Sequence, residues 1–92
     1  RSDSRAKAET SIEERNAEER LVERIRAGES EAFGELYRMF VPMVHGIVLA
    51  RVPRDEADDI VQNVFLAAYK NLHALRDPRA VGAWLAMIAR NR

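Results

Sequence analysis

The sequence predicts a small all-α protein, a compact bundle of about four helices. Glycine and proline are scarce, with four and three residues among 92, and β-branched runs are absent. Apolar residues recur three and four positions apart, the spacing of a buried helical stripe. A chain of this length can bury one hydrophobic core but not two. The expected helices cover approximately residues 11–27, 30–51, 55–72 and 78–92.

The start of the chain is polar and lacks periodicity. We therefore expect residues 1–17 to be a weakly ordered extension, followed by a folded domain over residues 18–92. Ser11 with Glu14 three residues later matches a capping box, which predicts that the first helix begins there. The apolar positions of this helix come later, at Leu21, Val22 and Ile25. Gly28 is expected to end it.

The second helix is expected to be capped by Ser30. Its apolar stripe comprises Phe33, Leu36, Tyr37, Phe40, Val41, Val44, Ile47 and Val48. Pro42 lies inside this stripe, and because proline removes a backbone donor and crowds the preceding turn, we expect a kink at residues 38–42. His45 is expected to be a partly buried helix residue. A metal site is disfavoured because only His73 could supply a second imidazole, and no spacing motif joins them.

The third helix, over residues 55–72, carries two different faces. Pro53 should end the preceding element and Asp55 should cap the helix, with further acids at the positive end of its dipole. Its buried stripe comprises Ala57, Val61, Val64, Phe65, Ala68 and Leu72. A second stripe turns away from the core and comprises Asp59, Gln62, Leu66 and Tyr69. This mixed stripe is either a docking surface or a solvated face with two exposed apolar residues.

The last helix should begin near Pro78, which suits a first helical position, with Asp77 as its cap. Its apolar positions are Val81, Trp84, Leu85 and Ile88. Trp84 could stack on a nucleic-acid base, but its spacing favours a place in the core. The chain begins at Arg1 rather than Met and stops at Arg92 inside an unfinished helical pattern, so we expect it to be a fragment of a longer protein.

The net charge of zero hides a segregation of charge along the chain. Residues 55–69 carry four acids and no basic residue, whereas residues 70–92 carry five basic residues and one acid. Neighbouring segments of opposite charge suggest two partners of opposite sign. The basic residues of the last segment are Lys70, Arg76, Arg79, Arg90 and Arg92.

The sequence contains no recognisable catalytic constellation. It has no nucleophile–base pair, no glycine-rich phosphate loop and no isolated pair of carboxylates, so we expect a binding protein without catalytic residues, cofactor or metal. The absence of cysteine excludes disulfides and thiolate metal sites and fits a cytoplasmic location. No apolar run approaches membrane-spanning length and no secretory signal pattern opens the chain, so membrane insertion is not expected.

Three segments, in order, resemble region 2 of bacterial RNA polymerase sigma factors of the extracytoplasmic-function (ECF) group of the sigma-70 family. The run from Leu21 to Glu29, with Glu31-Ala32-Phe33 and Leu36-Tyr37, resembles the opening of region 2. The run from Asp55 to Leu72 is similar to the core-binding segment of that family. Trp84-Leu85 and Ile88-Ala89-Arg90-Asn91 are similar to its promoter-melting helix. The resemblance extends from about residue 18 to residue 92.

The resemblance implies a promoter-recognition subunit that docks on the RNA polymerase core. In the family, the docking positions face a coiled coil of the largest subunit, the clamp helices, and they correspond to Asp59, Gln62, Asn63, Leu66 and Tyr69. They coincide with the mixed stripe, which favours docking over a solvated face. Many relatives carry an acid at the position of Asn63, so one charge contact is missing here. An anti-sigma factor that covers this face is a further implied partner.

The resemblance also implies recognition and melting of the promoter minus-ten element. In the family, the loop equivalent to residues 73–80 lies beside a base flipped out of the non-template strand, and the position of Asn91 lies in the reading helix. The expected DNA-binding residues are His73, Arg76, Asp77, Arg79, Ala80, Arg90, Asn91 and Arg92. The arginines suit phosphates, whereas the amide of Asn91 suits a base edge. Of the wedge aromatics in housekeeping sigma factors only Trp84 is present, so melting should depend on base capture.

Two other functions are compatible with the sequence. One is a helix-turn-helix repressor, although the connection over about residues 73–78 is longer than the usual tight turn. The other is a helical protein-interaction module whose basic end is merely solvated. Binding to a single-stranded minus-ten oligonucleotide at several salt concentrations would distinguish these possibilities.

Overall fold

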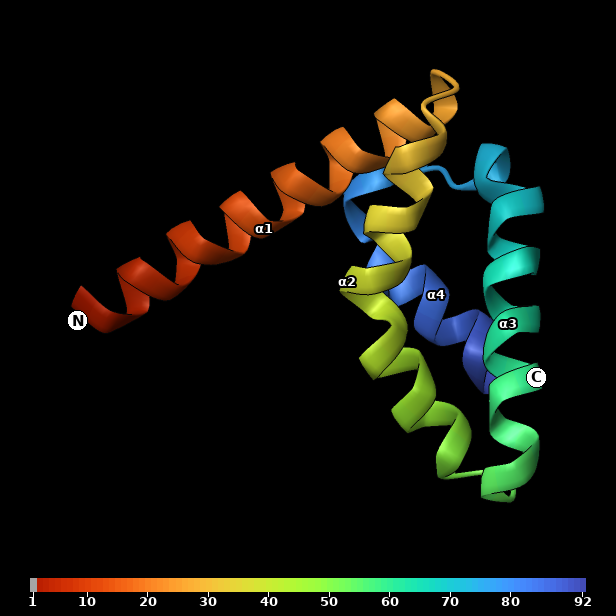
Figure 1. Ribbon diagram of the computed structural model, residues 1–92. Coiled ribbons are helices and arrows are strands. Elements are labelled where there is room, and N and C mark those ends of the chain that lie inside the picture. Colours follow the sequence, from red (N-terminus) through yellow and green to blue (C-terminus); the bar gives the residue numbers. More distant parts are fainter. Residues whose placement is uncertain (1) are drawn as a thin grey trace.

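The computed structural model describes the backbone of residues 2–92 and the side chains of residues 12–92. Its helices are α1 Ser2–Arg26, α2 Ser30–Leu49, α3 Arg54–Asn71, the short 3-10 helices η1 Leu72–Ala74 and η2 Pro78–Ala80, and α4 Val81–Arg90. This part of the chain contains no strand, so the all-α prediction is confirmed. α2 and α3 lie side by side, α4 packs against both, and the first half of α1 projects from the bundle (Figure 1).

α1 is longer than the sequence predicted. It begins at Ser2, so Ser11 and Glu14 lie inside the helix and the predicted capping box is wrong. The segment is rich in alanine, glutamate and arginine, whose high helix propensity carries the helix past the capping signal. Weak order over residues 1–17 stays a prediction. The predicted stop at Gly28 is confirmed, because its φ of 93° is a left-handed conformation that glycine adopts without strain.

The starts of α2 and α3 also differ from the predictions. Glu29 is the N-cap of α2, without a side-chain hydrogen bond, and Ser30 is already helical. The N-cap of α3 is Pro53, and Asp55 lies in the first turn, so both predicted side-chain caps are wrong. Proline fixes φ, here at −59° beside a ψ of 150°, and the helix begins directly after it. Pro42 lies inside an uninterrupted α2, and the expected kink stays a prediction.

The connection between α3 and α4 consists of two 3-10 turns. Asp77 is the N-cap of η2, as predicted, and its Oδ1 accepts a hydrogen bond from the Arg79 backbone N–H at 3.1 Å. Pro78 occupies the first helical position, which is also confirmed. The α-helical part starts only at Val81 and ends at Arg90, inside the predicted range of 78–92.

One hydrophobic core joins the α-helices. The stripe predicted over residues 55–72 is buried along its whole length, at Ala57, Val61, Val64, Phe65 and Ala68 of α3 and at Leu72 of η1. Leu85 of α4 is fully buried, whereas Phe40 and Trp84 pack against the core from partly buried positions, which confirms the core placement of Trp84. Within the described residues, no helix combines the length and apolar character needed to cross a membrane.

Candidate functional site

The mixed stripe of α3 faces away from the core, as its spacing predicted. Its members Asp59, Gln62, Leu66 and Tyr69 are all exposed. Leu66 is 55% exposed and Tyr69 is 60% exposed, high values for large apolar side chains. Two such residues one turn apart form part of a continuous surface rather than isolated exposed residues. The structure therefore provides a surface on which a partner could bury apolar area.

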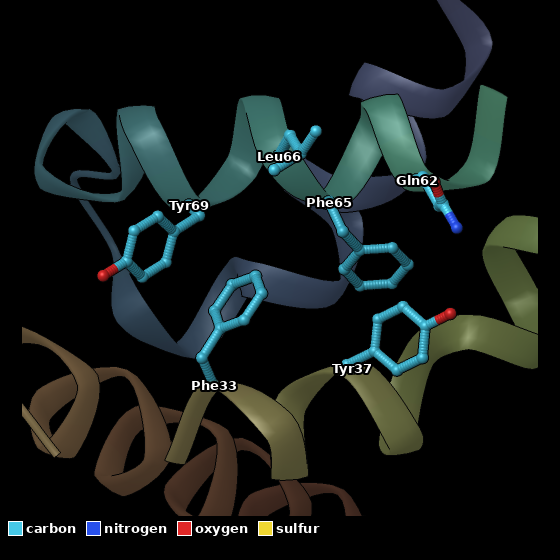
Figure 2. Close-up of a pocket in the computed structure, with 6 residues that line it drawn as sticks. All are labelled: Phe33, Tyr37, Gln62, Phe65, Leu66 and Tyr69. Atoms are coloured by element: carbon cyan, nitrogen blue, oxygen red, sulfur yellow. The ribbon is translucent and has the colours of Figure 1, made fainter. Parts of the chain in front are cut away.

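α2 completes this surface as a groove of about 410 Å³. We call it the aromatic groove, and it is lined by Phe33, Tyr37, Gln62, Phe65, Leu66 and Tyr69. Figure 2 shows the side chains of Phe33 and Tyr37 extending from α2 towards those of Phe65 and Tyr69 on α3. The two tyrosine hydroxyls lie at opposite ends of the groove (Figure 2). Both helices thus contribute to the predicted docking region.

The four aromatic rings of the groove form a row that alternates between the two helices. The ring centroids of Tyr69 and Phe33 lie 5.0 Å apart, and those of Phe33 and Phe65 lie 6.5 Å apart, both pairs edge to face. Those of Phe65 and Tyr37 lie 4.8 Å apart. These separations are typical of stabilising aromatic pairs. The row holds its exposed members in place, so that a partner would meet a preorganised surface.

Sequence reasoning missed the contribution of α2. It placed Phe33 and Tyr37 on a buried stripe, but Tyr37 is 37% exposed and both residues line the groove. A signal was present in the spacing, because the aromatic pairs Phe33–Tyr37 and Phe65–Tyr69 each lie four residues apart. Such pairs on two neighbouring helices can interdigitate. The sequence does not state which helices are neighbours.

The other predicted docking residues lie beside the groove rather than in it. Asp59 is exposed and is not among the residues that line it. Asn63 is exposed and lines a separate shallow hollow with Leu66, Lys70 and Arg92. Arg92, predicted to bind DNA, therefore lies next to the predicted polymerase face.

A second hollow of about 390 Å³ lies between α1 and the start of α4. We call it the polar hollow, and it is lined by Arg15, Glu18, Asp77, Arg79, Ala80, Gly82 and Ala83. Three of the predicted DNA-binding residues, Asp77, Arg79 and Ala80, thus share one concave site. Asp77 accepts hydrogen bonds from the backbone and the side chain of Arg79, which lower the pKa of the Asp77 carboxyl. This double contact fixes the direction of the Arg79 side chain.

Glu18 of α1 reaches across the polar hollow to the first turn of α4. The backbone N–H of Gly82 donates a hydrogen bond to its Oε1 at 3.4 Å. Burial raises the pKa of the Glu18 carboxyl, and the hydrogen bond from Gly82 opposes part of that rise. A methyl group at Gly82 would lie 2.8 Å from Cε1 of Phe40, so glycine permits the close packing here. Sequence analysis did not identify Glu18, because nothing local distinguishes it from the other glutamates of α1.

The remaining predicted DNA-binding residues are not gathered at this hollow. His73 and Arg76 are exposed in the connection between α3 and α4, which Arg26 holds by donating to the carbonyls of Leu72 and Leu75. Asn91 is the C-cap of α4, and α4 is ten residues long, so about 15 Å separates Asn91 from the loop. The structure does not bring the loop and Asn91 around a single base.

The C-terminal end of α4 lies against the end of α2. A guanidinium N–H of Arg51 donates to the carbonyl of Arg90. Cations at a helix C-terminus compensate the unpaired carbonyls and the negative end of the dipole. Arg51 also lines a small cleft with Arg92. The basic residues that were predicted to bind DNA therefore lie at both ends of α4. Arg76 and Arg79 precede its start, and Arg90 and Arg92 lie at its C-terminal end.

His45 is half-buried on α2, as predicted, and its Nε2 lies 3.6 Å from Oδ1 of Asp58. Within the described residues, no group of three or more potential ligands is placed to hold a metal ion. His45 and Asp58 therefore belong to neither the aromatic groove nor the polar hollow.

Comparison with known proteins identified one family whose pattern matches this chain. The family described as Sigma-70 region 2 matches residues 36–92, which include all of α3 and α4 and most of α2. No solved structure gave a significant match.

Several curated proteins are similar to the chain over most of its length. The ECF RNA polymerase sigma-E factor of Haemophilus influenzae is 33% identical over 78 residues, which are 85% of this chain and 41% of that protein. The ECF RNA polymerase sigma factor BldN of Streptomyces coelicolor is 40% identical over 73 residues, 77% of this chain and 28% of that protein. The ECF RNA polymerase sigma-E factor of Escherichia coli is 37% identical over 71 residues, which are 77% of this chain and 37% of that protein. The chain thus spans less than half the length of these relatives.

Proposed function

The chain belongs to the sigma-70 region 2 family, in the ECF group, and we propose that it binds RNA polymerase and promoter DNA as the region 2 domain of a transcription initiation factor. Sigma factors are transcription initiation factors and not enzymes. In this proposal the aromatic groove docks on the clamp helices of the largest polymerase subunit. The loop before α4 and α4 itself then recognise the promoter minus-ten element and open it.

The aromatic groove is the observation that carries the docking proposal. Aromatic side chains are enriched among residues that dominate binding energy, and here they line an open groove between α2 and α3. A groove between helices suits the apolar face of a partner helix, and the clamp helices form a coiled coil. Gln62 also lines the groove and can add a directional hydrogen bond.

Exposed acids near the start of α3 lie on the helix that would dock. Asp55, Glu56, Asp58 and Asp59 are all exposed on the helix that carries the groove. Exposed acids of this kind speed association with a basic partner and contribute less to its affinity. We propose that an anti-sigma factor would compete with polymerase for this groove, because exposed apolar surfaces mark protein–protein interaction sites.

The loop and α4 support the proposed contact with DNA. Arg76 and Arg79 are exposed and suit phosphate groups, which give affinity without sequence information. Asn91 lies about 15 Å away along α4, several times the 3.4 Å per nucleotide of a B-DNA strand. We therefore assign the loop and Asn91 to different nucleotides of the non-template strand. Trp84 packs against the core, which favours opening by base capture over insertion of an aromatic wedge.

The helix-turn-helix alternative is disfavoured by the connection between α3 and α4. This connection runs from Leu72 to Ala80 and contains two 3-10 turns, whereas a helix-turn-helix joins its helices by a turn of about three to four residues. If the chain binds the clamp helices but no single-stranded DNA, the alternative of a protein-interaction module would hold instead.

Substitution of Leu66 tests the docking proposal. Leu66→Ala should weaken binding to isolated clamp helices by about 2 kcal/mol, because central apolar contacts dominate such interfaces. Met39→Ala is the matched control, since Met39 is 50% exposed on α2 and lies outside the groove. Affinity can be measured by calorimetry, with helicity measured by circular dichroism. Unchanged affinity in both Leu66→Ala and Gln62→Ala, with normal helicity, would contradict the proposal.

Substitution of Tyr37 tests whether the docking site is the whole aromatic groove or only the mixed stripe of α3. If both helices form the docking site, Tyr37→Ala should weaken binding to the clamp helices although it lies on α2. If only α3 docks, Tyr37→Ala should behave like Met39→Ala in the same assay.

A further inference from the structure

The connection between α3 and α4 is anchored in the core by two leucines. Leu72 and Leu75 are buried, whereas His73 and Arg76, which follow them in the chain, are exposed. The residues expected to contact DNA therefore stand on backbone that the leucines hold against the core. How precisely this backbone is placed depends on its hydrogen bonds.

The backbone of this segment forms one short turn. In η1 the Leu75 N–H donates to the Leu72 carbonyl at 3.1 Å. At Leu75 the backbone is extended, with a φ of −70° and a ψ of 115°, so the helical conformation stops there. Short 3-10 turns have poor hydrogen-bond geometry, and the carbonyls at a helix C-terminus lack intrahelical donors. Donors from another part of the chain can fix such a segment.

Arg26, in the last turn of α1, supplies these donors. Its Nη2 donates to the carbonyl of Leu72 at 3.1 Å and to that of Leu75 at 2.5 Å. One terminal guanidinium nitrogen carries two N–H groups, so it can serve both carbonyls at once. Hydrogen bonds from a charged donor are stronger than those between neutral groups. The guanidinium therefore ties α1 to both ends of the turn.

α1 also holds the chain on the far side of the connection. Oε1 of Glu18 accepts a hydrogen bond from the Gly82 backbone N–H at 3.4 Å. Glu18 and Arg26 lie about 12 Å apart along the axis of α1. Arg76 lies in the chain between the two points that α1 holds, so the position of its backbone depends on α1.

We propose that Arg26 is a positioning residue for DNA binding, because it fixes the connection so that Arg76 can bind a phosphate group of the non-template strand. In this proposal Arg26 makes no phosphate contact of its own. The inference rests on the proposed function. It gives α1, which carries none of the predicted DNA-binding residues, a role in DNA binding.

A double-mutant cycle between Arg26 and Arg76 tests the proposal. Binding of the complete chain to a single-stranded oligonucleotide is measured by fluorescence anisotropy at about 0.1 M salt, where loss of one phosphate contact should weaken binding about fivefold. Arg76→Ala and Arg26→Gln should each cause about this loss, because glutamine is too short to reach the two carbonyls. In the Arg26→Gln background, Arg76→Ala should cost about twofold or less, since Arg76 has already lost its position.

Arg20→Gln is the matched control, because Arg20 is exposed on the same helix and lines a different hollow. It removes the same charge, and Arg76→Ala should still cost about fivefold in the Arg20→Gln background. A fivefold cost of Arg76→Ala in the Arg26→Gln background as well would show that the two arginines act independently. That result, or an unchanged affinity of Arg26→Gln, would overturn the proposal.

Amide hydrogen exchange measures the effect of Arg26 without DNA. Arg26→Gln should speed exchange of the Leu75 N–H about tenfold, because the turn loses its donors from α1, whereas Arg20→Gln should leave it unchanged. Unchanged exchange in Arg26→Gln would also overturn the proposal. Circular dichroism checks that each variant is helical, and Arg26→Met, which keeps the aliphatic stem, replaces Arg26→Gln with the same expected results if helicity is lost.

Failure of this inference and failure of the proposed function give different results. If the unsubstituted chain binds no single strand, the DNA-binding part of the proposed function is contradicted, and the role of Arg26 falls with it. If the chain binds DNA but the losses at Arg26 and Arg76 are additive, only the role of Arg26 is contradicted.

Discussion

The aromatic groove and the polar hollow are similar in size, about 410 and 390 Å³, and different in chemistry. The groove lies between α2 and α3 and is walled by aromatic rings and Leu66. The hollow lies between α1 and the start of α4 and is walled by two arginines, two acids and small residues. The two regions share one hydrophobic core and carry opposite kinds of surface.

This difference in surface chemistry would let one small domain bind the two unlike partners that we propose. Burial of aromatic surface gives affinity with little demand on the direction of each contact, which suits a protein helix. Oriented donors and acceptors give little net affinity but reject a ligand that leaves them unpaired, which suits the polar groups of DNA.

Truncation in the shared core should affect both regions. Leu85 is fully buried in α4, and Leu85→Ala should reduce the free energy of unfolding by about 2–5 kcal/mol. That is a large share of the roughly 5–15 kcal/mol expected for a domain. Urea denaturation followed by circular dichroism measures the loss. Clamp-helix binding and single-strand binding should then decline together on warming, and a decline in only one would argue against a common core.

Gly82→Ala should disturb the packing of α4 at the polar hollow, whereas the aromatic groove does not include Gly82. The new methyl group would lie 2.8 Å from Cε1 of Phe40, and such overpacking costs about 1–3 kcal/mol, more than the gain of up to about 1 kcal/mol in helix propensity. Gly46→Ala is the control, because no atom lies within 4 Å of its new methyl group. Gly46→Ala should therefore raise the melting temperature while Gly82→Ala lowers it. Equal shifts in the two variants would mean that the close packing at Gly82 is unimportant.

In the proposed DNA-binding region, substitutions of Asn91 and Arg76 should weaken DNA binding in different ways. Asn91→Ala should cost about 1–3 kcal/mol on a strand selected for tight binding and little on its scrambled version. Arg76→Ala should weaken both strands alike and lower the slope of log affinity against log salt by about 0.7. Anisotropy titrations at several salt concentrations measure both effects. An equal loss on both strands for Asn91→Ala would remove Asn91 from base reading.

Two glutamates should give small and opposite dependences of stability on pH. The pKa of Glu18 is raised, so its contribution to stability is present below the ordinary value of 4.5 and is lost as pH rises through the folded-state pKa. The pKa of Glu35 is lowered by hydrogen bonds from Arg24, so its contribution is present above 4.5 and is lost as pH falls.

Urea denaturation on either side of pH 4.5 measures these dependences. Glu18→Gln should become more stable relative to the unsubstituted chain as pH rises, and Glu35→Gln should become less stable. If the Glu18→Gln difference does not change with pH, the burial of Glu18 against α4 would be in doubt.

Helix periodicity made much of this fold predictable from the sequence. The buried stripe of α3, the mixed face opposite it and the stop at Gly28 follow from residue spacing and from one glycine in a left-handed conformation. Helix boundaries were less predictable, because capping signals such as Ser11 and Asp55 compete with propensity and with a neighbouring proline. The free energies of capping and of helix propensity differ by only a few tenths of a kcal/mol to about 1 kcal/mol. This difference is too small for a residue pattern to decide where a helix begins.

The sequence by itself determined the helical class, the two faces of α3 and the family resemblance, because these depend on residues close together in the chain. Only the tertiary structure decided which faces meet. It joined Phe33 and Tyr37 to α3 and placed Glu18 of α1 against Gly82. Such juxtapositions depend on how helices cross and pack, which arises from the summed burial of many side chains rather than from any local pattern.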